Sequence, residues 1–144
     1  MIIERLTRIS DEVVKSLDQL MLQLAPGCKS LTEEYLQEIL DLPNVFLFVA
    51  KQGEQIVGTF SLVLYKIPTG LKATIEDVVV DISVRGQKVG EKMILFAIDY
   101  AGKALGVTKV DLTSSPNRVA ANALYQKLGF ERRNTNVYRF EMKE

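Results

Sequence analysis

The stretch from Ile75 to Leu95 constrains the fold of this chain more than any other. It begins with a run of β-branched residues, Ile75 to Val80, which contains two carboxylates, Glu76 and Asp77. A basic turn with two glycines follows, and then come apolar residues at helical spacing: Val89, Met93, Phe96, Ala97, Tyr100, Ala101 and Ala104. This pattern predicts a strand that leads through a turn into a long helix. Such a turn directs free backbone N–H groups and the positive end of the helix toward one point, which suits a phosphate.

Composition excludes several kinds of chemistry. The chain has 144 residues, 18 basic and 18 acidic side chains, no histidine and one cysteine. A net charge of zero argues against a nucleic-acid partner. Without histidine, a Ser-His or Cys-His hydrolase is excluded and no metal site is expected. Any general base must then be a carboxylate, a lysine, a tyrosine or a water molecule.

The remaining pattern predicts a mixed α/β fold. Strands are predicted at residues 2–9, 45–50, 56–65, 75–80, 107–113 and 137–142, and helices at 11–24, 33–40, 89–105 and 117–128. Ser30-x-x-Glu33 resembles a capping box for the second helix. We expect one domain, residues 1–144, of α/β (α+β) type, with a mixed central sheet of about six to seven strands and about four helices. The polar N-terminus and the lack of long apolar runs predict a cytoplasmic protein without membrane contact.

Two motifs carry a resemblance to a known family. Val80-Asp81-x-x-x-Arg85-Gly86-x-x-Val89-Gly90 resembles the acetyl-CoA-binding segment of the GNAT superfamily of N-acetyltransferases. Downstream, Ala121-x-x-Leu124-Tyr125-x-x-Leu128-Gly129-Phe130 resembles the helix of that family that ends in a Tyr-x-x-Leu-Gly-Phe signature. The resemblance implies a GNAT-like domain over the whole chain and acetyl-CoA as co-substrate. The first motif departs from the family pattern at one position, because Lys88 stands where a glycine is usual.

The resemblance implies roles for two groups of residues in binding acetyl-CoA. The backbone amides of the turn would hold the diphosphate of CoA, and those of the strand would hold the thioester carbonyl and the pantetheine arm. The turn residues are Arg85, Gly86, Gln87, Lys88, Val89 and Gly90, and the strand residues are Val78, Val79 and Val80. The plainer alternative is a strand-to-helix turn that needs glycine only for its backbone angles.

Glu76 and Tyr125 are the catalytic candidates. Glu76 matches the family glutamate that takes a proton from the substrate ammonium, directly or through water. Adjacent strand residues point to opposite faces, so at most one of Glu76 and Asp77 is expected to face a given cleft. Tyr125 matches the tyrosine that protonates the departing thiolate. The alternatives are a structural ion pair for Glu76 and a core position for Tyr125.

Three further residues each have two interpretations. At the start of the last predicted helix, Arg118 occupies a position where the family often has a CoA-contacting asparagine, and Asn117 precedes it. Either residue could contact the cofactor, or Asn117 could only cap the helix. Cys28 lies between the two N-terminal helices, in a segment that borders the acceptor site in the family; a bystander thiol is the simpler interpretation.

The function predicted from these residues is N-acetyl transfer. An acetyl group would move from acetyl-CoA to a primary amine by direct attack in a ternary complex, and the acceptor would be a small molecule or a peptide amine. The alternative is an acyl-CoA-binding sensor or regulatory module without turnover, which the departures at Lys88 and Arg118 keep open. A homodimer is a further expectation from the family. A dinucleotide-binding domain is not supported, because the Gly-x-Gly-x-x-Gly spacing is absent.

Overall fold

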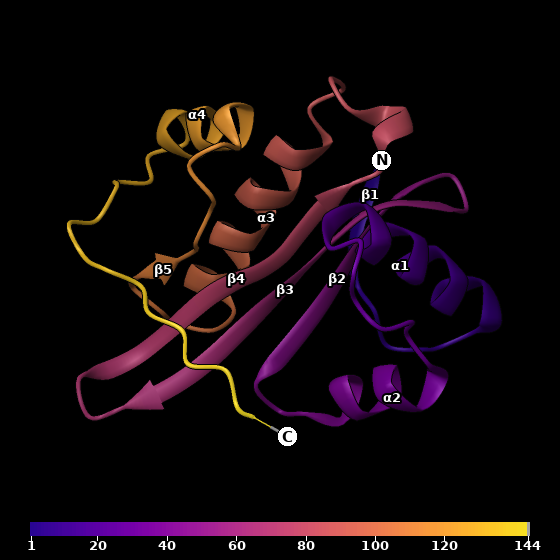
Figure 1. Ribbon diagram of the computed structural model, residues 1–144, viewed down its shortest axis with the longest axis horizontal. Helices are drawn as coiled ribbons and strands as arrows, with labels where there is room; N and C mark the ends of the chain where they lie inside the picture. Colours follow the sequence, from indigo (N-terminus) through magenta and orange to yellow (C-terminus); the bar gives the residue numbers. More distant parts are fainter. Residues whose placement is uncertain (144) are drawn as a thin grey trace. The chain divides into compact units, whose positions relative to one another are not determined.

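The computed structural model describes residues 1–143 (Figure 1). The chain divides into two compact units, Met1–Thr113 and Ser114–Glu144. The first unit holds the sheet, and the second holds the last helix. The organisation as one domain over residues 1–144 stays a prediction. Within residues 1–143, no helix is both long enough and apolar enough to cross a bilayer.

The first unit is built on a five-stranded mixed sheet with the order β1-β2-β3-β4-β5. Neighbouring strands are antiparallel except β4 and β5, which are parallel. The elements in chain order are β1 (Ile2–Arg5), α1 (Asp11–Leu24), α2 (Glu33–Asp41), β2 (Val45–Gln52), β3 (Gln55–Ile67), β4 (Gly70–Val80), the 3₁₀ turn η1 (Ile82–Val84), α3 (Val89–Lys103) and β5 (Val110–Asp111). A mixed sheet was predicted, and it is confirmed.

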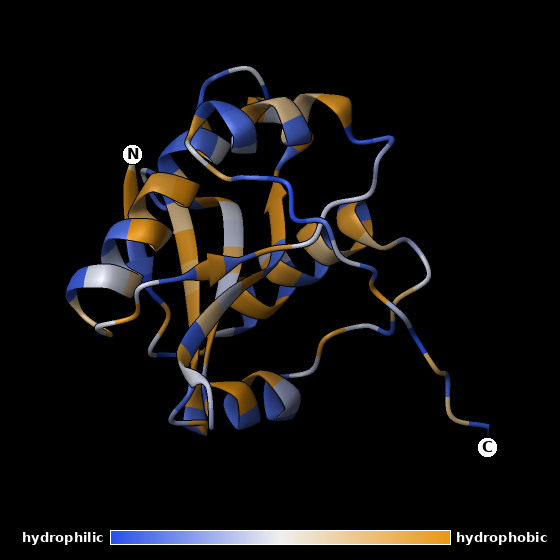
Figure 2. Cartoon of the chain, turned by 90° about the vertical axis from the view of Figure 1, so that its left-hand side faces the viewer, coloured by the Kyte–Doolittle hydropathy of each residue, from blue (hydrophilic) through white to orange (hydrophobic). Residues whose placement is uncertain are grey.

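The two faces of this sheet pack against different helices. On one face, α1 and α2 bury a cluster that consists of Leu6, Leu17, Leu20, Leu36, Leu47, Val49, Ile56 and Val79. On the other face, the ring of Phe48 on β2 stacks on Phe60 of β3 and meets Phe96 and Tyr100 of α3. In Figure 2 the helices carry hydrophilic and hydrophobic residues along their length, whereas the strands are mostly hydrophobic. Amphipathic helices on a sheet that is apolar on both faces form this two-sided core.

The N-terminal ends of α1 and α2 have side-chain caps. The Ser10 hydroxyl accepts a hydrogen bond from the Val13 N–H, and the Thr32 hydroxyl accepts one from Tyr35. The expectation that Ser30 begins a capping box is therefore wrong. The helix begins two residues later than Ser30 would require, because the Leu31 N–H donates to the Asp18 carboxylate at 2.9 Å and keeps residue 31 in the loop.

The second unit contains one helix, α4 (Val119–Lys127), within its described residues. The helix begins later than residue 117, because the Ser115 carbonyl accepts hydrogen bonds from the Arg118 N–H and the Asn122 side chain in a preceding turn. Residues 137–142 form no strand, so the sheet has five strands and not six or seven. Val137, Tyr138, Phe140 and Met142 are between 77% and 87% exposed. Alternation alone predicted that strand, but a strand also needs a hydrogen-bonding neighbour.

Candidate active site

A β-bulge on β4 places the acidic pair. Ser61 of β3 lies opposite Glu76 and Thr59 lies opposite Val79, so the single residue Phe60 faces both Asp77 and Val78. Asp77 has φ 52°, in the left-handed region that non-glycine residues rarely adopt. An extra residue of this kind bends the strand and shifts its alternation of side chains. Both Glu76 and Asp77 are exposed.

The bulge changes two expectations about these carboxylates. The expected placement on opposite faces assumed regular alternation, which is interrupted at Asp77. The expected cost of burying a carboxylate does not arise, because both side chains are exposed. Glu76 lies opposite Ser61, two residues from Thr59, which faces Val79 in the cluster beneath α1. Glu76 is therefore on the face of the sheet that α1 and α2 cover.

The surroundings of Glu76 are polar. The Thr74 hydroxyl donates a hydrogen bond to Glu76 Oε1 at 3.1 Å, and this bond fixes the carboxylate along the strand. The cross-strand neighbour Ser61 adds a second hydroxyl-bearing side chain on the same face. No ion pair to Glu76 is found among residues 1–143, so the alternative of a structural ion pair has no support there.

The outer edge of β4 is open over its second half. β5 pairs with β4 only at Ala73 and Thr74. From Ile75 to Val80, no strand in the described part of the chain pairs with that edge. An edge without a neighbour presents backbone N–H and C=O groups that a ligand can use. Val78, Val79 and Val80 lie on this open segment.

The turn between β4 and α3 has two residues in the left-handed region. Gly86 has φ 85°, and Lys88 has φ 63° with ψ 22°. Arg85, Gly86, Gln87 and Lys88 are all exposed, whereas Val84 and Val89 on either side are buried. The buried valines anchor the turn, and the four residues between them project into solvent. Lys88 occupies the position where the family usually has glycine, and a glycine would adopt these backbone angles without strain.

The beginning of α3 differs from the beginnings of α1 and α2. Lys88 is the N-cap residue and makes no side-chain capping hydrogen bond, whereas Ser10 and Thr32 cap the other two helices. The first N–H groups of a helix have no partner within the helix, and they carry its positive partial charge. Arg85 adds a full positive charge, and its Nε donates to the Val80 carbonyl at 3.3 Å, which holds the side chain against the end of β4. The turn therefore combines the positive charge of Arg85 with the beginning of a helix that has no side-chain cap.

Asp81 organises the first part of this turn, a role that the sequence motif does not indicate. Its Oδ1 accepts hydrogen bonds from the Ser83 N–H at 2.9 Å and the Ser83 hydroxyl at 2.7 Å. Gln23 of α1 donates to Oδ2. The Ser83 backbone and hydroxyl hydrogen bonds, with smaller contributions from Gln23 and the Arg85 charge, lower the pKa of Asp81 below its ordinary value. The motif contained Asp81, but no local signal identified its partner on α1.

Tyr125 lies in the second unit. Its side chain is 8% exposed, and its ring meets Phe130 edge-on with 5.9 Å between centroids. Burial raises the pKa of Tyr125 above 10.0, and the Arg118 charge opposes this only in part. The phenol therefore holds its proton at neutral pH. Asn117 and Arg118 are exposed in the turn before α4, and neither the Asn117 nor the Arg118 side chain caps that helix, for which Arg118 is the N-cap residue.

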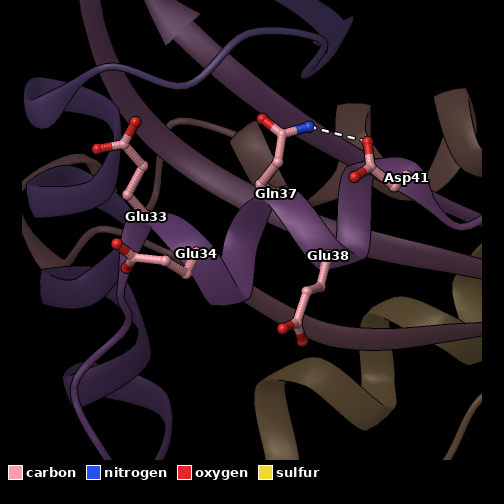
Figure 3. A pocket seen from close by; sticks show the side chains of 5 residues that line it. All are labelled: Glu33, Glu34, Gln37, Glu38 and Asp41. Atoms are coloured by element: carbon pink, nitrogen blue, oxygen red, sulfur yellow. Dashed lines mark hydrogen bonds between the residues drawn. The ribbon is translucent and has the colours of Figure 1, made fainter.

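An acidic depression on α2 contains none of the predicted site residues. It is open, with a volume of about 450 Å³, and is lined by Glu33, Glu34, Gln37, Glu38 and Asp41 (Figure 3). The Gln37 amide donates to Asp41 at 2.9 Å across one helical turn. These side chains form the solvated face of an amphipathic helix. Among the residues that the structure describes, no group of three or more His, Cys, Asp or Glu side chains is arranged to hold a metal ion.

A model of the acetyltransferase (GNAT) family matches residues 14–130. The chain belongs to the acetyltransferase (GNAT) family, which confirms the resemblance carried by the two motifs. Acetyl transfer is the class of reaction that this membership supports.

Individual relatives add detail. A mycothiol acetyltransferase of Renibacterium salmoninarum is 34% identical over 89 residues, which is 60% of this chain and 26% of the relative. The chain thus spans about a quarter of that curated protein. Glucosamine-6-phosphate N-acetyltransferase from Arabidopsis thaliana is 25% identical, with a TM-score of 0.78 and coverage of 97% of this chain and 99% of that one. An aminoglycoside acetyltransferase from an uncultured soil metagenomic sample shares the fold, with a TM-score of 0.85, 21% identity and coverage of 99% and 95%.

Proposed function

We propose that this protein transfers an acetyl group from acetyl-CoA to the primary amine of a small molecule. The observation that carries the proposal is the uncapped beginning of α3, which follows a turn with left-handed residues at Gly86 and Lys88. Successive backbone N–H groups in such a turn form a concave anion site. The two charges of a diphosphate suit this site, and Arg85 lies beside it. Lys88 adds an ammonium and leaves the backbone N–H in place.

The open edge of β4 provides the second part of the proposed donor site. Within the segment of Val78, Val79 and Val80, the backbone N–H groups that point to this open edge would donate to the pantetheine arm and to the thioester carbonyl. A carbonyl that accepts such hydrogen bonds becomes more electrophilic, and its oxygen is stabilised as negative charge develops during attack. The bulge at Asp77 supports this role, because it changes the direction of the strand immediately before these amides.

Glu76 is the proposed general base. Its carboxylate is exposed, is oriented by the Thr74 hydroxyl, and lies on the face of the sheet that α1 and α2 cover. An amine binds as its ammonium, so one proton must leave before the nitrogen can attack. Glu76 would take that proton, directly or through one water molecule. The nitrogen then forms a bond to the acetyl carbon and loses its second proton to water, and the carbon–sulfur bond breaks to release the CoA thiolate.

Tyr125 is the proposed general acid for that thiolate. Its raised pKa supports this role, because a donor must still carry its proton at the pH of the reaction. A direct route needs no covalent enzyme intermediate. Cys28, the single cysteine, is exposed in the loop after α1 and has no assigned role in the proposed route.

The proposed acceptor is a small molecule and not a protein lysine. Support comes from the relatives, since one named for glucosamine-6-phosphate covers almost the full chain at 25% identity. The polar side chains near Glu76, which are Ser61 and Thr74, suit a hydroxyl-bearing amine such as an amino sugar. Amino acids, polyamines and peptide amines remain in the test panel as competing acceptors.

The experiment is a thiol-release assay with acetyl-CoA and this panel, carried out with the wild type, Glu76→Gln and Asp77→Asn. We expect turnover with a small amine, and a loss of about a hundredfold or more in the rate of Glu76→Gln at neutral pH. Asp77→Asn is the matched control, because it removes the neighbouring charge and is expected to lower the rate far less. Equal losses in both variants would refute the assignment of the base. Acetyl-CoA binding without turnover on any amine would favour the non-catalytic sensor.

A further inference from the structure

Gln23, near the end of α1, contacts two groups in the turn that follows β4. Its Oε1 accepts a hydrogen bond from the Ile82 N–H at 3.0 Å, and its Nε2 donates to Asp81 Oδ2 at 3.4 Å. These partners are 59 and 58 residues away in the sequence. A single amide thus uses its acceptor on the backbone and its donor on a side chain of the same turn. Both its position and its orientation are fixed by this pair of contacts.

The contact with Asp81 extends into the turn. Asp81 Oδ1 accepts both hydrogen bonds of Ser83, and these bonds define the start of η1. The last residue of η1, Val84, is buried and immediately precedes Arg85. A shift at Asp81 would therefore pass along a short, rigid segment to the residues that form the proposed diphosphate site. Gln23 holds the beginning of that segment against α1.

The other end of the turn is held in a similar way. Gln52, the last residue of β2, donates through Nε2 to Gln87 Oε1 at 3.2 Å. Residues 81–88 are therefore fixed near both ends by amide side chains from different elements of the first unit. Between these two contacts, Arg85 and Gly86 are exposed, and Lys88 is exposed after them. An arrangement held at its ends and open in its middle suits a preorganised ligand-binding turn.

We propose that Gln23 is a positioning residue for the donor site, which acts by fixing the turn at residues 81–88 in the conformation that binds the diphosphate of acetyl-CoA. This inference rests on the proposed function. Gln23 does not touch the diphosphate site itself, since its hydrogen bonds end at Asp81 and Ile82. Gln23 would affect the affinity for acetyl-CoA. If the turn samples several conformations, only the molecules in the binding-competent conformation bind, and the apparent affinity falls by that fraction.

The test compares Gln23→Leu with the wild type and with Gln37→Leu. The leucine keeps much of the volume of glutamine and removes both hydrogen bonds. Gln37 is the matched control, because it also makes an exposed amide–carboxylate hydrogen bond, to Asp41 on the far end of α2. Two quantities are measured: the Kd for acetyl-CoA by isothermal titration, and the amide hydrogen exchange rate of Ile82 in the protein without acetyl-CoA. Thermal melting of all three proteins reports any general loss of stability.

We expect Gln23→Leu to bind acetyl-CoA about fivefold more weakly, which corresponds to about 1 kcal/mol. The Ile82 amide should exchange faster, while the melting temperature stays close to that of Gln37→Leu. Gln37→Leu should match the wild type in both Kd and exchange. A general structural role would instead lower the melting temperature and leave the Kd of the folded protein unchanged.

Two results would overturn the inference. If Ile82 exchanges equally fast in the wild type and in Gln23→Leu, the hydrogen bond does not hold the turn. If Ile82 exchanges faster but the Kd is unchanged, Gln23 holds the turn without affecting the cofactor. Both results leave the proposed function intact, provided that the wild type binds acetyl-CoA. A wild type that fails to bind acetyl-CoA refutes the proposed function itself, and the positioning role with it.

Discussion

Replacing Lys88 by glycine tests the conformation of the turn before α3. Lys88 has φ 63° and ψ 22°, and the left-handed region costs a residue with a side chain about 1–2 kcal/mol, whereas glycine adopts it freely. Glycine also gains freedom in the unfolded chain, which costs about 0.4–1 kcal/mol of stability. The two effects differ by about 0.8 kcal/mol at the middle of their ranges, so Lys88→Gly is expected to stabilise the fold by about that amount. For a chain of this size, such a gain raises the melting temperature by about 2–3 °C.

Two further variants separate the backbone effect from the charge. Lys88→Ala removes the ammonium but keeps the unfavourable φ, so its melting temperature should stay near that of the wild type. Gln87→Gly adds glycine one residue earlier, at a position that does not have positive φ, and should lower the melting temperature. Thermal unfolding followed by circular dichroism measures all three. A Lys88→Gly variant that melts at or below the wild-type temperature would refute the reasoning.

Three other predictions follow from the structure. Gly58→Ala should destabilise the protein by about 1–3 kcal/mol in urea unfolding, because the added Cβ would lie 2.7 Å from the Met93 sulfur and 3.3 Å from the Val79 carbonyl oxygen; an unchanged midpoint would contradict this packing. Tyr125→Phe should lower acetyl transfer by about tenfold or less in the thiol-release assay, since a thiolate leaves readily; a larger loss would contradict this, and the wild-type phenol should keep its proton at neutral pH because burial raises the pKa of Tyr125. Because the pKa of Asp81 is lower in the folded protein, its carboxylate stabilises the fold at pH values above its ordinary pKa of 3.8. This stabilisation is lost as the pH falls through the lower folded pKa. The difference in melting temperature between the wild type and Asp81→Asn should therefore be constant from pH 5 to 8 and shrink below about pH 4, and a difference that grows in acid would refute the assignment.

The parts of the fold that could be predicted are those whose signal is local. The strand, turn and helix from Ile75 to Lys103 could be predicted because a run of β-branched residues, a turn with glycines and apolar residues at helical spacing follow one another in one stretch. The strand at residues 137–142 was predicted from alternation and is absent from the structure. Alternation describes which side chains are apolar, but it does not identify a neighbouring strand.

The parts of the site that could not be predicted depend on distant partners. Glu76 and the turn residues were identified from motifs, but the bulge at Asp77 follows from the register between β3 and β4, which a single strand does not reveal. Gln23 carries no signal of its own, because its partners are almost sixty residues away. Lys88, in contrast, can be recognised from the sequence alone as a departure from the family pattern. The structure adds its positive φ angle, at which a lysine is less favourable than a glycine.

The most direct test of the account is isothermal titration of the purified protein with acetyl-CoA, with free CoA, ATP and NAD as comparisons. The account predicts saturable binding of acetyl-CoA and CoA with a Kd on the order of micromolar. Replacing Arg85 by alanine should weaken this binding, because it removes the charge beside the beginning of α3. Binding of ATP and NAD should be much weaker. A folded protein that gives no heat with acetyl-CoA would contradict the central claim that the turn between β4 and α3 is a donor site.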